Sequence, residues 1–153
     1  MTAVFRDDIQ FEKPLTLTAG TGQRLPKFLE VPFTAAVIAA YGLGDALVSD
    51  DLPANALILG VHVVISTAFT YSNVGTTGVS VKIGNADDDG FGLNTALAGT
   101  AGYRRPAPGA LVGGVVAGGA DGLIAVFTPT GGAASLAHLS AGAGKIVIDY
   151  LEV

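Results

Sequence analysis

The chain has 153 residues and no cysteine, so we expect one domain with a packed core and neither a disulfide nor a thiolate metal site. Charged residues make up 14% of the sequence, against roughly 25% in an average soluble domain, and 50% of the residues are hydrophobic. The net charge of −5 at pH 7 argues against a nucleic-acid partner, because phosphates are bound by clusters of lysine and arginine.

The hydropathy pattern does not predict a membrane helix. The longest apolar stretch, residues 56–65, is interrupted by Gly60 and His62 and is much shorter than the roughly 20 residues that a membrane span needs. No basic start followed by an apolar run marks a signal peptide. We therefore expect a protein without a membrane partner that is made and used without export.

Residues 1–30 are predicted to form a segment distinct from the body of the protein, which comprises residues 31–153. The segment holds four basic and four acidic side chains, whereas the body holds four basic and nine acidic ones. Pro14 and Pro26 interrupt the segment. The leading segment is therefore neutral and the body is acidic.

Two interpretations of the leading segment remain open. Ile9 and Phe11 alternate with polar residues, and so do Leu15 and Leu17, which indicates extended backbone. The segment is either an extended arm that pairs with a neighbouring subunit or the first strands of the chain's own sheet, since an added strand satisfies an open sheet edge. The candidate contact residues of such an arm are Phe5, Ile9 and Phe11.

Period-two alternation, which marks strands with one buried face, continues through residues 57–65, 79–83 and 146–150. The first of these strands is predicted to be central, and its core-facing residues are predicted to be Leu57, Leu59, Val61, Val63 and Ile65. Further strands are predicted at residues 33–41, 111–117 and 123–128. Glycine- and proline-rich turns separate the strands. About eight strands result, and the predicted fold is all-β, a β-sandwich or jelly roll.

Two stretches leave a choice between strand and helix. Residues 33–41, FTAAVIAAY, are rich in alanine, which favours a helix by intrinsic propensity, although a strand is the preferred prediction. Residues 92–98 could form a turn of helix inside a long loop. Neither alternative changes the all-β class.

Asp87, Asp88 and Asp89 precede Gly90 and form an acidic loop. Carboxylates are hard oxygen ligands that suit calcium, but the loop lacks the other EF-hand positions, notably the glutamate at the twelfth. The alternative is a solvated polar turn without a metal.

The sequence predicts no catalytic residue and no cofactor. His62 and His138 are too few for zinc in a chain without cysteine, and His62 is expected to be a partly buried strand residue with one hydrogen bond. The residue types of a Ser-His-Asp triad are present, but no G-x-S-x-G motif locates one. The glycine-rich residues 19–24 and 112–122 lack the G-x-x-x-x-G-K-[ST] pattern of a phosphate loop.

Tyr103, Arg104 and Arg105 are a candidate contact with a partner, because tyrosine and arginine are enriched where interfaces gain most of their binding energy. An ordinary exposed loop is the alternative. The low charge of the whole chain favours a protein with subunit interfaces, since these bury surface that would otherwise need charged residues.

Several segments resemble the small virion proteins of tailed bacteriophages. These are DLPANALILGVHVVISTAFT (residues 51–70), VKIGNADDDGFG (81–92), FTPTGG (127–132) and AGAGKIVIDYLEV (141–153), with LEVPFTAAV (29–37) compatible. The resemblance covers about residues 50–153 and consists of strand and turn sequences.

This resemblance implies a non-enzymatic structural role. Several of these phage proteins are head decoration, or cement, proteins that have a β-sandwich or jelly-roll body and sit on the capsid as trimers. A homotrimer that binds the major capsid protein on the outer surface of the virion head is therefore implied for this chain. The alternatives are another virion component, such as a head fibre, tail or baseplate protein, or a module that binds glycan on the host. An enzyme is the least favoured class.

Overall fold

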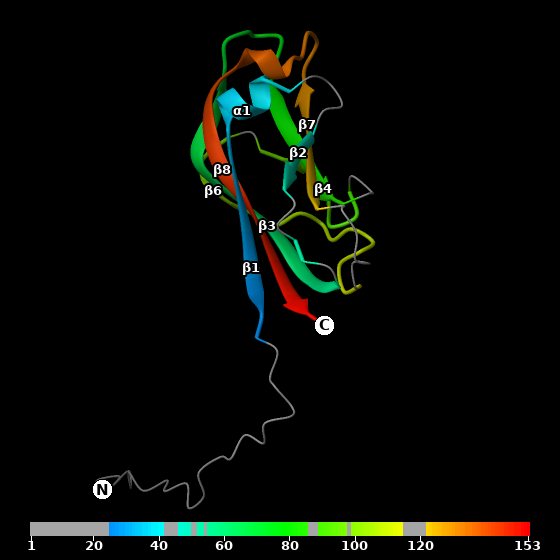
Figure 1. Ribbon diagram of the computed structural model, residues 1–153. Helices are drawn as coiled ribbons and strands as arrows, with labels where there is room; N and C mark the ends of the chain where they lie inside the picture. Colours follow the sequence, from blue (N-terminus) through cyan, green and yellow to red (C-terminus); the bar gives the residue numbers. More distant parts are fainter. Residues whose placement is uncertain are drawn as a thin grey trace, which may run out of the picture.

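A computed structural model describes residues 25–41, 46–49, 52–53, 55–85, 89–97, 99–114 and 122–153. These residues form two antiparallel four-stranded sheets that pack face to face (Figure 1). Sheet A contains, in spatial order, β1 (Lys27–Thr34), β8 (Leu139–Glu152), β3 (Ala56–Tyr71) and β6 (Gly102–Arg104). Sheet B contains β2 (Ala46–Ser49), β7 (Leu123–Thr130), β4 (Gly78–Gly84) and β5 (Gly92–Ala96). The predicted all-β sandwich of about eight strands is confirmed.

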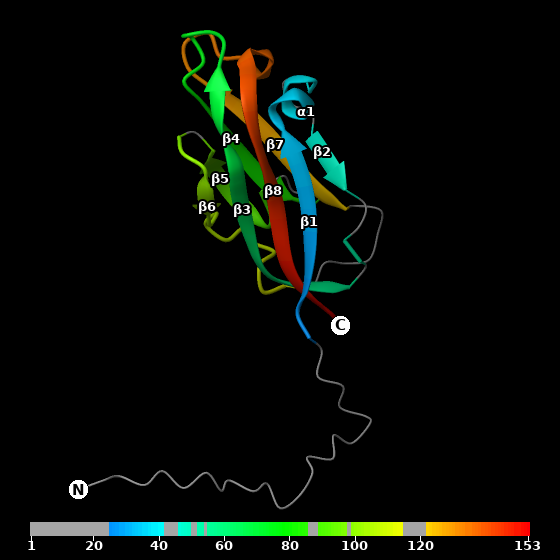
Figure 2. The same cartoon turned by 90° about the vertical axis from the view of Figure 1, so that its left-hand side faces the viewer.

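The two longest strands form the centre of sheet A. β3 has 16 residues and β8 has 14, and they pair antiparallel from Ala56 opposite Glu152 to Tyr71 opposite Leu139. β1 pairs with the other side of β8 along its whole length, and the short β6 pairs with β3. Sheet A therefore presents a four-strand surface that faces away from sheet B, and Figure 2 looks onto it.

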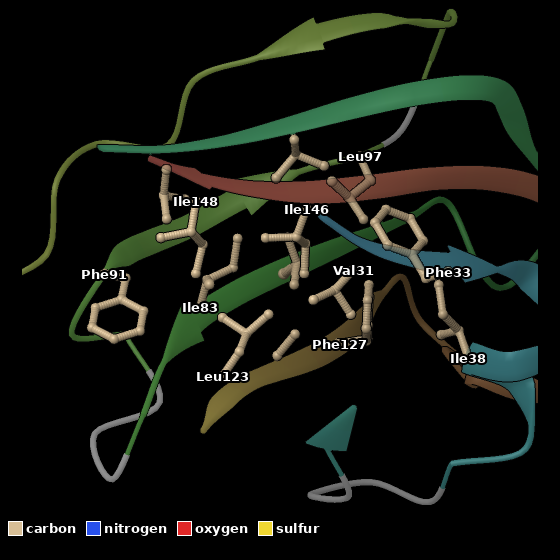
Figure 3. Packing of buried hydrophobic residues seen from close by; sticks show 14 of the residues in the cluster. Val31, Phe33, Ile38, Ile83, Phe91, Leu97, Leu123, Phe127, Ile146 and Ile148 are labelled. Carbon is tan, nitrogen blue, oxygen red and sulfur yellow. The ribbon is translucent and has the colours of Figure 1, made fainter. Parts of the chain in front are cut away.

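The hydrophobic core fills the space between the sheets, because alternate residues of β1, β3, β7 and β8 point inward. Figure 3 shows inward side chains of sheet A, such as Ile146, against those of sheet B, such as Ile83. Three phenylalanines join the sheets at one end of the core. The ring centroids of Phe33 and Phe127 lie 5.3 Å apart in an edge-on arrangement, and Phe33 stacks on Phe69 at 6.2 Å.

A β-bulge near the start of β3 changes which residues face the core. Ile58 pairs with Tyr150 and Gly60 pairs with Asp149, so Leu59 is an extra residue with no partner of its own. The bulge shifts the inward phase by one residue: Ile58 is fully buried, whereas Leu59 is 41% exposed. The prediction that Leu57 and Leu59 share the core face with Val61, Val63 and Ile65 is therefore wrong for the first two.

The strand predicted at residues 33–41 ends at Thr34, and a five-residue helix, α1 (Ala35–Ala39), follows it. The Thr34 hydroxyl accepts a hydrogen bond of 3.3 Å from the Val37 backbone N–H, which is the interaction of a helix N-cap. Ala35 and Ile38 point from α1 into the end of the core. The alternative of a helix was thus the correct one for these residues. None of the helices in the described ranges is long and apolar enough to span a membrane.

Two other segments differ from the predicted elements. Residues 92–96 form the strand β5 instead of a helical turn. Residues 111–114, predicted as part of a strand, form a turn, in which the Gly113 N–H donates to the Ile58 carbonyl at 2.8 Å and the Leu111 N–H donates to the Gly90 carbonyl at 2.7 Å. This turn closes one end of the sandwich. Residues 115–117 of the same predicted strand lie outside the described residues.

The predicted boundary at residue 30 falls inside β1. Residues 27–30 pair with β8 as part of sheet A, so this part of the leading segment belongs to the body's own sheet. Phe5, Ile9, Phe11 and the alternation at residues 15–18 lie outside the described residues. The choice between an arm and further strands therefore remains a prediction for residues 1–24.

Tyr71, at the end of β3, is expected to make the fold sensitive to alkaline pH. Its hydroxyl oxygen is buried without a well-formed hydrogen bond to the described residues. Burial raises the pKa of Tyr71 above its ordinary value of 10.0, and a polar contact with the Val79 backbone offsets part of this effect. Because the unfolded chain ionises at lower pH than the folded one, the free energy of unfolding is expected to fall as pH rises above about 10.

The replacement Tyr71→Phe tests whether Tyr71 causes this fall in stability at alkaline pH. The variant is expected to be at least as stable as the wild type at pH 7, since it loses a buried polar group that lacks a good partner. Its stability is expected to fall less between about pH 9 and pH 11, which urea titrations at each pH measure. An unchanged pH dependence in Tyr71→Phe would contradict the assignment.

Candidate functional site

The solvent-facing side of sheet A, here named the outer face, carries a group of polar and aromatic side chains. A shallow depression of about 340 Å³ crosses it. Val64 of β3 and Val147 of β8 form the aliphatic floor, because both strands turn these residues away from the core. Phe28 from the edge strand β1 and Tyr103 from the edge strand β6 line the two sides and are 65% and 55% exposed. The outer face is therefore aromatic at both edges.

A chain of three polar side chains crosses the outer face from β6 to β8. The Nε2 atom of His62, on β3, lies 2.7 Å from Oδ2 of Asp149 on β8. The hydroxyl of Tyr103 is hydrogen bonded to Nδ1 of the same imidazole, and the two rings are 5.2 Å apart. A neutral His62 that donates from Nε2 to the carboxylate must accept at Nδ1 from the Tyr103 O–H. The imidazole therefore forms a hydrogen bond at each of its two nitrogens, whereas the sequence predicted one hydrogen bond for His62.

Strand pairing explains why these three residues meet. In the register of sheet A, His62 lies opposite Val147, and Asp149 lies opposite Gly60. The carboxylate of Asp149 therefore reaches the imidazole diagonally across the two strands, and even a Cβ at Gly60 would make only an ordinary contact with Oδ2, at 3.8 Å. Tyr103 pairs with Val64, two residues from His62. The bulge at Leu59 sets this register.

The arrangement of Tyr103, His62 and Asp149 suits the positioning of an aromatic ring better than catalysis. An aspartate that orients a histidine, which in turn contacts a hydroxyl, is also the logic of a Ser-His-Asp triad. Here, however, the hydroxyl belongs to a half-exposed tyrosine on an open surface, whereas catalytic groups gain their effect in clefts that exclude water. The hydrogen bonds to His62 and from His62 to Asp149 hold Tyr103 in position, although Tyr103 projects from a strand of only three residues.

The charged groups of the outer face are paired with one another. Lys145 Nζ lies 2.6 Å from Glu30 Oε1, which joins β8 to β1. Asp149 is paired with His62, and these two side chains are 24% and 20% exposed. No unpaired cluster of positive charge that could attract a polyanion is present among the described side chains of the depression.

Arg104 and Arg105, predicted to act with Tyr103, do not line this depression. The Arg104 guanidinium donates to the Thr100 carbonyl at 2.9 Å and to the Tyr103 carbonyl at 3.1 Å, so it stabilises the turn before β6. Arg105 lines a separate cavity of about 40 Å³ together with Pro106 and Pro108. Within the predicted group, Tyr103 is therefore the residue that belongs to the outer face.

The other candidate sites do not join the outer face. Asp89 lies 3.7 Å from Lys82 Nζ, while Asp87 and Asp88 lie outside the described residues. Among the described residues no three histidine or carboxylate side chains are grouped so as to hold a metal, and calcium at the acidic loop stays an untested expectation. His138 Nδ1 lies 2.7 Å from the Thr76 hydroxyl at the far end of β3, where it joins two turns.

Sequence reasoning missed Phe28, Asp149 and the contact between Asp149 and His62. A signal was present for the two residues, because both occupy the polar phase of alternating strands, where a phenylalanine is unusual. Nothing in the sequence states that β8 lies between β1 and β3, which is the condition for the contact.

No protein-family model matches the chain, and no curated protein sequence matches it either. A solved structure with a similar fold is a chain of the "Cyanophage Pam1 capsid asymmetric unit". The two chains are 17% identical, the alignment covers 100% of each, and the TM-score is 0.53. At this level of identity the likeness shows that the two chains have a similar fold.

Proposed function

We propose that the chain is a non-enzymatic structural component of a phage capsid. The observation that carries the proposal is the likeness, over the full length of both chains, to a chain of a cyanophage capsid. The low charge of the protein and its open outer face support the same role, because both suit a chain that is used in contact with other subunits. The role requires no cofactor.

Within the capsid we propose the part of a decoration, or cement, protein. It sits as a homotrimer on the outer surface of the head and binds the major capsid protein of its phage. The resemblance of residues 51–70 and 141–153 to small virion proteins supports this position. A decoration protein that binds the assembled, expanded shell more tightly than its precursor stabilises the expanded state by its differential affinity.

Mass and shell binding test the proposal together. Light scattering of the purified full chain is expected to give three times the 15.3 kDa mass of one chain. Mixed with expanded and unexpanded heads of its own phage that lack the protein, it is expected to pellet with the expanded heads. A monomer that pellets with neither kind of head would overturn the proposal and would favour a tail, fibre or glycan-binding role.

A further inference from the structure

We infer that the outer face of sheet A is the surface by which the chain docks on the capsid, and that its partner is an uncharged, largely apolar patch of the shell protein. This inference rests on the proposed function and adds the contact surface and the chemistry of the partner. Tyr103 and Phe28 are its anchors, and the pair His62 and Asp149 positions Tyr103.

The charges of the outer face indicate an uncharged partner. Glu30 forms an ion pair with Lys145, and Asp149 is hydrogen bonded to His62, so each carboxylate already has a partner on this face. A charged partner would have to break these pairs to gain new ones, whereas an uncharged partner leaves them intact.

The two aromatic residues have the exposure and the rigidity of interface anchors. Phe28 and Tyr103 are 65% and 55% exposed, and they are the large apolar side chains most exposed on this face. The Tyr103 ring is held by its hydrogen bond to His62 before any partner arrives. Binding then costs little side-chain entropy, which is the advantage of a preorganised aromatic anchor.

The openness of the depression argues for a broad partner and against a small molecule. The depression is open, while sites for small molecules enclose most of their ligand.

The test compares wild type with a double variant, Phe28→Ser with Tyr103→Ser, in binding to expanded heads that lack the protein. The affinity of the double variant is expected to fall at least about thirtyfold, since two exposed anchors are removed. Val74→Ser is the matched control: Val74 is 99% exposed and belongs to the turn between β3 and β4. This turn lies at the end of sheet A opposite to the start of β1 (Figure 2), and the replacement is expected to leave the affinity within about twofold.

Two variants of Tyr103 distinguish the contribution of its aromatic ring from that of the hydrogen bond that positions the ring. Tyr103→Phe keeps the ring and loses the hydrogen bond to His62, so it is expected to bind less well than wild type but better than Tyr103→Ser. The melting temperature and the circular dichroism spectrum of each variant are measured first. Both are expected to equal those of wild type, because the outer face is not part of the core. Equal losses of affinity in Tyr103→Phe and Tyr103→Ser would show that the hydroxyl alone makes the contact. This result would overturn the role of the ring as an anchor.

The outcomes distinguish this inference from the proposed function. Wild type that pellets with heads, together with a double variant that pellets equally well, would overturn the docking surface and leave the capsid role intact. Wild type that binds no heads would overturn the capsid role itself. A double variant that binds heads as wild type does but has a smaller mass in solution would show that the outer face joins copies of this chain, which also overturns the inference.

Discussion

Replacement of Phe33 by alanine is expected to lower the free energy of unfolding by about 3–5 kcal/mol, the largest effect of any single side-chain truncation we predict. Phe33 is 2% exposed and is the aromatic residue through which the two sheets meet. Its ring contacts Phe69 in its own sheet and Phe127 in the other. Alanine would remove both contacts and leave a cavity between rings that β3 and β7 hold in place.

Phe28→Ala is the matched control, because it makes the same chemical change five residues earlier in the same strand. Phe28 is 65% exposed, so its replacement is expected to change stability by less than about 0.5 kcal/mol. Urea denaturation of both variants at one protein concentration, followed by circular dichroism, measures the difference. Similar losses in the two variants would show that β1 does not alternate between core and solvent as the structure has it.

The replacement Gly142→Ala is expected to destabilise the protein by about 2–5 kcal/mol, from a steric clash and from backbone strain together. Gly142 lies in β8 with φ of +140°, a conformation that side chains rarely adopt. A Cβ at this position would lie 2.2 Å from Cδ1 of the Phe69 ring. The ring cannot easily withdraw, because Phe33 is stacked on it.

Gly132→Ala provides the control for this substitution. A Cβ at Gly132, in the turn after β7, would meet no atom within 4 Å, and its φ lies outside the left-handed region. We expect a change within about 0.5 kcal/mol. Thermal and urea denaturation of the two alanine variants measure the contrast. A Gly142→Ala variant as stable as Gly132→Ala would mean that β8 and the Phe69 ring are not in contact.

The phenylalanine variants also separate stability from function. Phe33 and Phe28 belong to one strand but to opposite faces of sheet A. Loss of Phe33 weakens the fold and, through unfolding, every activity of the protein. Loss of Phe28 leaves the fold intact and is expected to weaken docking alone. A binding defect in Phe28→Ala at unchanged stability would therefore point to the outer face itself.

The sequence alone determined the class of the fold and much of its core. Val79, Val81 and Ile83 alternate with small or polar residues, and in the structure they are buried, as are Ile146 and Ile148. Alternation is local: it records which side of a strand meets water, and it needs no knowledge of the neighbouring strand. The low charge, the absence of cysteine and the exposed Tyr103 were equally readable from composition and position.

The tertiary structure decided what depends on distant residues. The alanine-rich residues after Thr34 favour a helix by local propensity and by the Thr34 cap, but the packing of Ile38 into the core depends on distant residues and decides between helix and strand. The bulge at Leu59 reverses the inward phase at the start of β3. The outer face exists because β8 lies between β1 and β3, and this order brings Asp149 to His62 across 87 residues of sequence. Strand order and register follow from long-range packing of the two sheets, which period-two alternation leaves open.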